Sequence, residues 1–90
     1  MQDMTIFRIE QDTTWVLSFR ITEADARAEA EDCVRGEFGP SVRTEWRPDP
    51  SFEGVSVLYR VDGDRLVATR YTVTAITVGG TFTPLVPATA

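Results

Sequence analysis

One stretch of the chain, residues 22–35, has the sequence of a helix, and the segments on both sides of it have the patterns of strands. Thr22 is a good N-cap residue, and Asp25 three positions later gives a variant of the capping box. The alanine-rich sequence continues to Arg35, and Gly36 suits the position just after a helix end. We therefore expect a single helix that packs on a face of a sheet.

The predicted helix has one narrow apolar stripe, which consists of Ala26, Ala30, Cys33 and Val34 at 100° per residue. These side chains are small, so the helix can lie close to a sheet, which argues against a large cavity between them. Free cysteine is among the most buried residue types. We therefore expect Cys33 to be a buried apolar side chain rather than a reactive thiol.

Five segments have strand patterns, namely residues 4–9, 14–21, 42–47, 52–61 and 66–78. In the second, Trp15, Leu17, Phe19 and Ile21 alternate with other residues, which predicts one half-buried face. Alternation also places Trp46 with the apolar residues of its strand, which favours a core position over an interface anchor.

The sequence Asp62-Gly63-Asp64 predicts a hairpin turn. Pairing Asp62 with Arg65 brings opposite charges together and places Val61 opposite Leu66, so we expect this register. The predicted order is β-β-α-β-β-β, an α+β fold with a single antiparallel sheet of about five strands and one helix on a face. Residues 1–78 form the domain, and residues 79–90 form an uncharged C-terminal tail or arm.

The charge is unevenly distributed along the chain. Residues 1–40 contain nine acidic residues and four arginines, residues 41–70 contain five of each, and residues 71–90 contain none. This acidic field argues against binding to nucleic acid or to an anionic membrane. No apolar run is long enough to span a membrane, and the first residues do not resemble a signal peptide, so we expect a cytoplasmic or virion location.

The residues that most enzymes need are missing from this sequence. It has no histidine, no lysine and one cysteine, and it lacks the common nucleotide-binding and hydrolase motifs. Asp62-Gly63-Asp64 resembles part of a calcium loop but lacks the further oxygen ligands. We therefore expect no catalytic site, no metal and no cofactor.

Two groups of residues are candidates for binding another protein. The first is the uncharged C-terminal edge and tail, with Ile76, Val78, Phe82, Leu85 and Val86. The second is an acidic helix face formed by Asp25, Glu29 and Asp32. Each has a plainer interpretation, because the tail can cover its own sheet and the acidic face can simply be solvated.

We expect a non-enzymatic assembly component, such as a small phage or virion structural protein, that associates with protein partners as a homo-oligomer or larger assembly. The first alternative is a small acidic inhibitor of the phage anti-defence type, which binds a basic partner through the acidic helix face. The second alternative is a small ligand-binding or enzymatic α+β domain with a cavity between helix and sheet.

Overall fold

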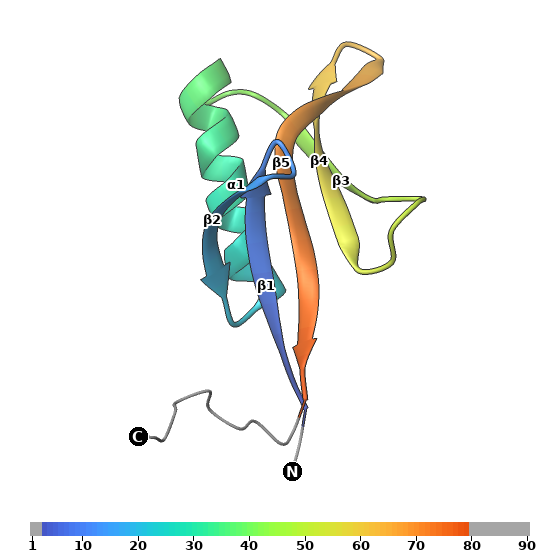
Figure 1. Cartoon of the computed structure of the whole chain (residues 1–90). Coiled ribbons are helices and arrows are strands. Elements are labelled where there is room, and N and C mark those ends of the chain that lie inside the picture. The colour runs from blue at the N-terminus through green and yellow to red at the C-terminus, as the bar shows by residue number, and fades with distance from the viewer. Residues whose placement is uncertain (1–2, 80–90) are drawn as a thin grey trace.

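Five antiparallel strands and one helix form the part of the chain that the computed structural model describes, residues 3–79 (Figure 1). The elements are β1 (Met4–Gln11), β2 (Trp15–Arg20), α1 (Glu23–Phe38), β3 (Thr44–Pro48), β4 (Val55–Asp62) and β5 (Arg65–Val78). The predicted α+β class and element order are confirmed. None of the described helices is both long enough and apolar enough to cross a membrane.

The strands lie in the order β2-β1-β5-β4-β3, so β5 is the central strand and β2 and β3 are the two edges. The uncharged C-terminal strand is therefore not an edge over most of its length, and only beyond Thr74, at Ile76 and Val78, does it pair with β1 alone among the described strands. β5 is 14 residues long, and it pairs with β1 on one side and with β4 on the other. Its threonine and valine side chains suit a strand with neighbours on both sides.

The β4–β5 hairpin has the register that the sequence predicts. Asp62 pairs with Arg65, and Val61 pairs with Leu66. Further along, the pairing shifts between Val57 and Tyr59. Leu58 lies at this shift on the helix side of the sheet and is completely buried.

The core lies between α1 and one face of the sheet. The strands contribute Ile9, Leu58, Tyr71 and Val73, and the helix contributes Ala26, Ala30 and Val34. Cys33 and Trp46 pack against this cluster and are partly buried. The small apolar stripe therefore packs on the sheet as predicted. We call the opposite side of the sheet the open face, because no described element covers it as α1 covers the core side (Figure 1).

The helix begins as predicted but ends later. The Asp25 backbone N–H donates to the Thr22 hydroxyl at 3.2 Å, as an N-cap requires. The helix then continues through Gly36 to Phe38, so the predicted end at Gly36 is wrong. The left-handed residue that ends it is Gly39, with φ of 101°, whose N–H donates to the Arg35 carbonyl at 2.8 Å.

Candidate functional site

The edge strand β2 carries apolar side chains that are exposed to solvent. The exposed fraction is 68% for Trp15, 53% for Phe19, and 74% for Ile21, which follows the strand directly. Val16 and Leu17 are also exposed. We call these five side chains the β2 surface. Single apolar residues are common on monomeric proteins, but an apolar edge strand is a site at which other chains can pair.

A bulge divides the β2 surface between the two sides of the sheet. The paired residues are Phe7–Arg20, Arg8–Phe19, Ile9–Ser18, Glu10–Val16 and Gln11–Trp15. Leu17 is the extra residue in this register. Phe19 and Val16 therefore lie on the open face, and Trp15 lies on the side of α1. The prediction that Trp15, Leu17, Phe19 and Ile21 share one half-buried face is wrong, because the bulge interrupts the alternation and these side chains stay exposed.

One helix is too narrow to cover this sheet. A helix is about 10 Å wide and strands lie about 4.8 Å apart, so α1 covers roughly two of the five strands. β2 meets the helix mainly through polar groups. Ser18 Oγ donates to the Glu29 carboxylate at 2.8 and 2.7 Å, and Arg20 Nε donates to it at 2.7 Å. This width argument needs only the predicted elements, one helix and about five strands, so it is the signal in the sequence that could have indicated an uncovered edge.

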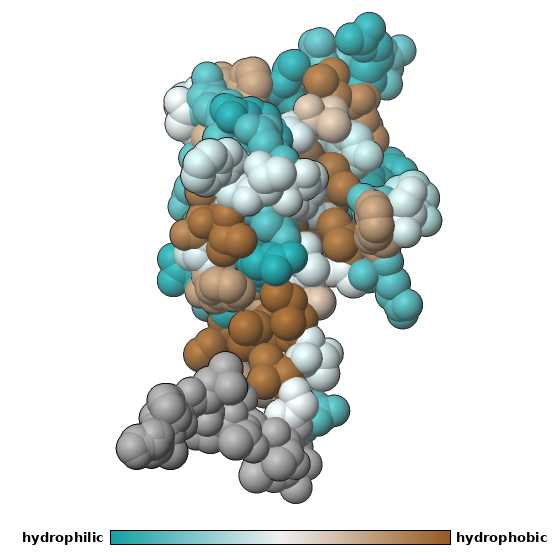
Figure 2. Space-filling model, in the orientation of Figure 1, coloured by the Kyte–Doolittle hydropathy of each residue, from teal (hydrophilic) through white to brown (hydrophobic). Residues whose placement is uncertain are grey.

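The open face combines apolar and polar areas. Figure 2 shows hydrophobic side chains over β2 and over the far ends of β1 and β5, with hydrophilic side chains between them. The register places Met4 opposite Val78 and Ile6 opposite Ile76 at these ends. Ile76 and Val78 are partly buried there, and they lie beyond the last β4 partner of β5, which pairs with Thr74.

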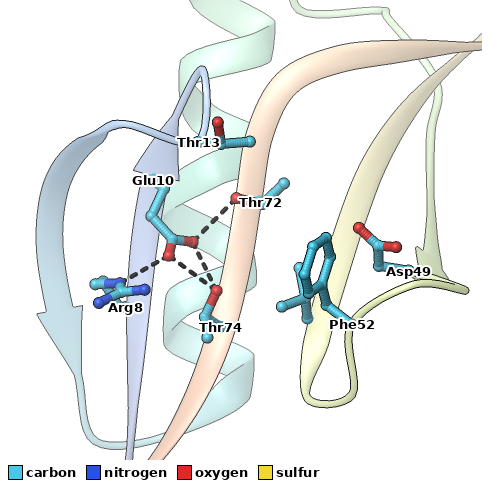
Figure 3. Close-up of a pocket in the computed structure, with 8 residues that line it drawn as sticks. Arg8, Glu10, Thr13, Asp49, Phe52, Thr72 and Thr74 are labelled. Atoms are coloured by element: carbon cyan, nitrogen blue, oxygen red, sulfur yellow. Dashed lines mark hydrogen bonds and ion pairs between the residues drawn. The ribbon is translucent and has the colours of Figure 1, made fainter.

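A hollow of about 300 Å³ lies on the open face beside β1, β5 and the loop that connects β3 to β4 (Figure 3). Its lining residues are Arg8, Glu10, Thr13, Asp49, Phe52, Val55, Thr72 and Thr74. Glu10 is only 4% exposed, which is unusual for a carboxylate. The hollow is therefore on the side of the sheet away from α1, and it is distinct from the cavity between helix and sheet that the ligand-binding alternative assumes.

The buried carboxylate of Glu10 is fully engaged by neighbouring donors. Arg8 Nε donates to it at 2.7 Å, the Thr72 hydroxyl at 3.0 Å, and the Thr74 hydroxyl at 2.9 and 2.8 Å. A buried charge is tolerated when it is paired and hydrogen-bonded in this way. These contacts join β1 to β5, so they favour a structural role for Glu10 over proton transfer or ligand binding.

The acidic helix face is less available than the sequence suggests. Glu29 accepts hydrogen bonds from β2, and Asp32 forms an ion pair with Arg35. Asp25 is exposed at the first turn. The three carboxylates therefore do not form one unpaired acidic surface.

Trp46 lies on β3 and joins that strand to the helix. Its indole Nε1–H donates to the Glu31 carboxylate at 2.7 Å, and the Arg27 guanidinium carbon lies 5.1 Å from the ring centroid. The ring is partly buried against the core. These contacts give Trp46 a role inside the fold, which is the core position that the alternation favoured.

Two weakly acidic side chains meet near the C-terminal half of α1. Burial raises the pKa of the Cys33 thiol, and the nearby carboxylates of Glu29, Glu37 and Asp32 raise it further. Burial and the hydrogen bond that the Tyr71 hydroxyl donates to Glu37 raise the pKa of Tyr71. Both groups therefore stay protonated at neutral pH, which disfavours a nucleophilic Cys33.

The remaining predicted contact residues, Phe82, Leu85 and Val86, lie outside the described residues. Within residues 3–79, no group of three or more cysteine, aspartate or glutamate side chains is arranged to hold a metal ion. Comparison of the chain with protein-family models, with curated proteins and with solved structures gave no match.

Proposed function

We propose that this chain is a non-enzymatic assembly protein that associates through β2. The observation that carries this proposal is the β2 surface, an edge strand with Trp15 and Phe19 each more than half exposed. An edge strand has backbone N–H and C=O groups free on its outer side, and a chain that pairs with it satisfies them. Burial of the adjacent aromatic side chains adds affinity.

The proposal keeps the assembly function that the sequence suggests, and it assigns the principal contact to β2 instead of to a C-terminal edge. β5 lies at the centre of the sheet, so most of it has no free edge to offer. A structural component of a larger particle, such as a virion, is the fullest form of this proposal. The contacts of Glu29 and Glu10 support it indirectly, because they leave the inhibitor and ligand-binding alternatives with fewer available groups.

The test is the mass of the full chain in solution, measured by light scattering after gel filtration over a range of concentrations. We expect the wild-type chain to form a defined oligomer. Phe19→Lys should return it to the monomer, because a charged side chain on the edge is costly to bury. Phe52→Lys is the matched control, since Phe52 is 65% exposed in the loop between β3 and β4 and should leave the oligomer intact.

Circular dichroism establishes that both variants remain folded. A wild-type chain that stays monomeric at its solubility limit contradicts the proposal. A chain ending at Gly79 tests the C-terminal contact separately. If the oligomer survives this truncation but not Phe19→Lys, β2 carries the contact, and the reverse result gives the contact to the C-terminal residues.

A further inference from the structure

We propose that the partner of β2 is β2 of a second copy of this chain, paired antiparallel with Phe19 opposite Phe19. This inference rests on the proposed function and specifies its partner and register. It follows from three constraints on the β2 edge: symmetry, the side of the sheet on which each side chain lies, and charge.

Symmetry restricts the possible registers. When two identical antiparallel strands join two sheets into one, the twofold axis passes through a residue pair, because hydrogen-bonded and non-hydrogen-bonded pairs alternate along the strands. One residue must therefore lie opposite its own copy. Residues at equal distances on either side of that residue then pair with each other.

The side on which each residue lies excludes most of the remaining registers, because paired side chains share a side of the sheet. Centring the pairing on Leu17 places Trp15, on the helix side, against Phe19, on the open face. Centring it on Ser18 places Val16 against Arg20, which also lie on opposite sides. The bulge is the cause in both cases. Centring the pairing on Val16 or on Trp15 would require Asp12 and Thr13 to pair as strand residues, but their positive φ places them in the turn.

Charge and apolar matching decide between the last two registers. Centring on Arg20 places two arginines directly opposite each other, which is unfavourable. Centring on Phe19 places Phe19 against its own copy on the open face and Ser18 against Arg20 on the helix side, and it brings Leu17 of one copy across from Ile21 of the other. Leu17, Phe19 and Ile21 of each copy then lie next to the same residues of the other around the axis. Their present exposure, 40% for Leu17, 53% for Phe19 and 74% for Ile21, is what this contact would remove.

The helix side is complementary in charge in the same register. Ser18 already holds Glu29 at 2.7 Å, and Arg20 contacts the same carboxylate at 2.7 Å. The Arg20 of the second copy would lie across from Ser18 and therefore beside Glu29. Two arginines and two glutamates thus alternate near the axis, and neither charge is buried without an opposite partner.

Cysteine cross-linking tests the register directly. In a Cys33→Ala background, Phe19→Cys should form a disulfide-linked dimer under mild oxidation, because facing Cα atoms are about 4.5–5.5 Å apart and a disulfide needs about 4.4–6.8 Å. Leu17→Cys alone should not, because its copy lies about 13 Å away along the strands. A mixture of Leu17→Cys and Ile21→Cys chains should form the mixed dimer. Phe52→Cys is the exposed control and should stay monomeric.

The outcomes separate this inference from the proposed function. If the wild-type chain is an oligomer that Phe19→Lys dissociates, but Phe19→Cys does not cross-link to itself, the register is wrong and the assembly function stands. If Leu17→Cys links to itself as readily as Phe19→Cys, the pairing is centred elsewhere. If the wild-type chain is a monomer and no variant cross-links faster than Phe52→Cys, both proposals fail.

Discussion

The two edges of this sheet are built differently. β3 carries Glu45 and Arg47, which form an ion pair on its exposed side, and it ends at Pro48. Charged side chains and proline are the common means by which natural edge strands avoid pairing with other chains. β2 has exposed Trp15 and Phe19 and no proline. The same sheet therefore has one protected edge and one that is open to a partner.

The two edge strands are also attached to α1 in different ways. β3 is held by the partly buried ring of Trp46, which reaches Glu31 and packs against the core. β2 is held by Ser18 and Arg20 through polar contacts with Glu29. β3, the protected edge, is thus integrated into the core. Much of the apolar area of the β2 surface remains available for association.

The two tryptophans give the largest expected difference between the edges. Trp46→Ala should lower the free energy of unfolding by about 3 kcal/mol, because it removes a packed ring and the hydrogen-bond donor of Glu31. Trp15→Ala should change it by less than about 0.5 kcal/mol, since Trp15 is 68% exposed. Urea denaturation, at a concentration where the chain is monomeric, measures both.

The effects of the two substitutions on association should have the opposite order. Trp15→Ala should weaken the oligomer, and a folded fraction of Trp46→Ala should associate as the wild type does. Equal stability losses in the two variants would show that the edges do not differ in their attachment to the core.

A second experiment removes the protection of β3. Glu45→Val combined with Arg47→Val leaves the net charge unchanged and makes the edge apolar. In the Phe19→Lys background, where β2 is blocked, this double variant should restore association. We expect an affinity gain of at least about tenfold, which corresponds to about 1.4 kcal/mol. Analytical ultracentrifugation measures it.

The matched control is Glu45→Ser with Arg47→Ser, which removes the same charges without adding apolar area. If both double variants associate equally, loss of charge alone exposes the edge. If neither associates, Pro48 and the short length of β3 are sufficient protection.

The sequence predicted the local elements of this fold better than their positions in the sheet. The cap at Thr22 and the Asp62–Arg65 register depend on neighbouring residues, and both are confirmed. The bulge at Leu17 and the central position of β5 depend on pairing between distant segments, and alternation along one strand does not report it. The site at β2 was missed for this reason, because the regular alternation of its residues predicted burial.

Tyr71 lies on the central strand, between the two edges, and a substitution there tests the stability of the core that both edges share. Its pKa is raised above the usual value of 10.0 by burial and by its hydrogen bond to Glu37. Above about pH 10 an unfolded chain loses this proton while the folded chain keeps it, so stability should fall as the pH rises. Tyr71→Phe should cost about 1 kcal/mol at pH 7, and less as the pH approaches 11.

Urea denaturation between pH 7 and pH 11 measures this convergence. Cys33→Ala is the control, because the raised pKa of Cys33 gives a loss of stability in the same direction. If the free energies of unfolding of wild type and Tyr71→Phe change in parallel with pH, then Tyr71 does not contribute to the pH dependence of stability. Neither change should alter association through β2, because Tyr71 is buried in the core and Cys33 packs against it, so neither side chain belongs to the β2 surface.

The smallest expected effect concerns the turn that leads into β2. Asp12 and Thr13 both have positive φ, 57° and 61°, as a tight hairpin turn requires. A left-handed conformation costs an L residue roughly 1–2 kcal/mol, and most for a β-branched one. Thr13→Gly should therefore raise the free energy of unfolding by about 0.5 kcal/mol, after the entropic cost of glycine is subtracted.

The β4–β5 hairpin provides the reciprocal control. Gly63 has φ of 66°, and a Cβ there would meet no atom within 4 Å, so Gly63→Thr tests backbone strain alone. It should lower the free energy of unfolding by about 1–2 kcal/mol. If Thr13→Gly instead destabilises the chain, the hydrogen bond from the Thr13 hydroxyl to the Asp12 carbonyl, at 2.6 Å, outweighs the strain. Thr13 would then help to stabilise the turn that precedes β2.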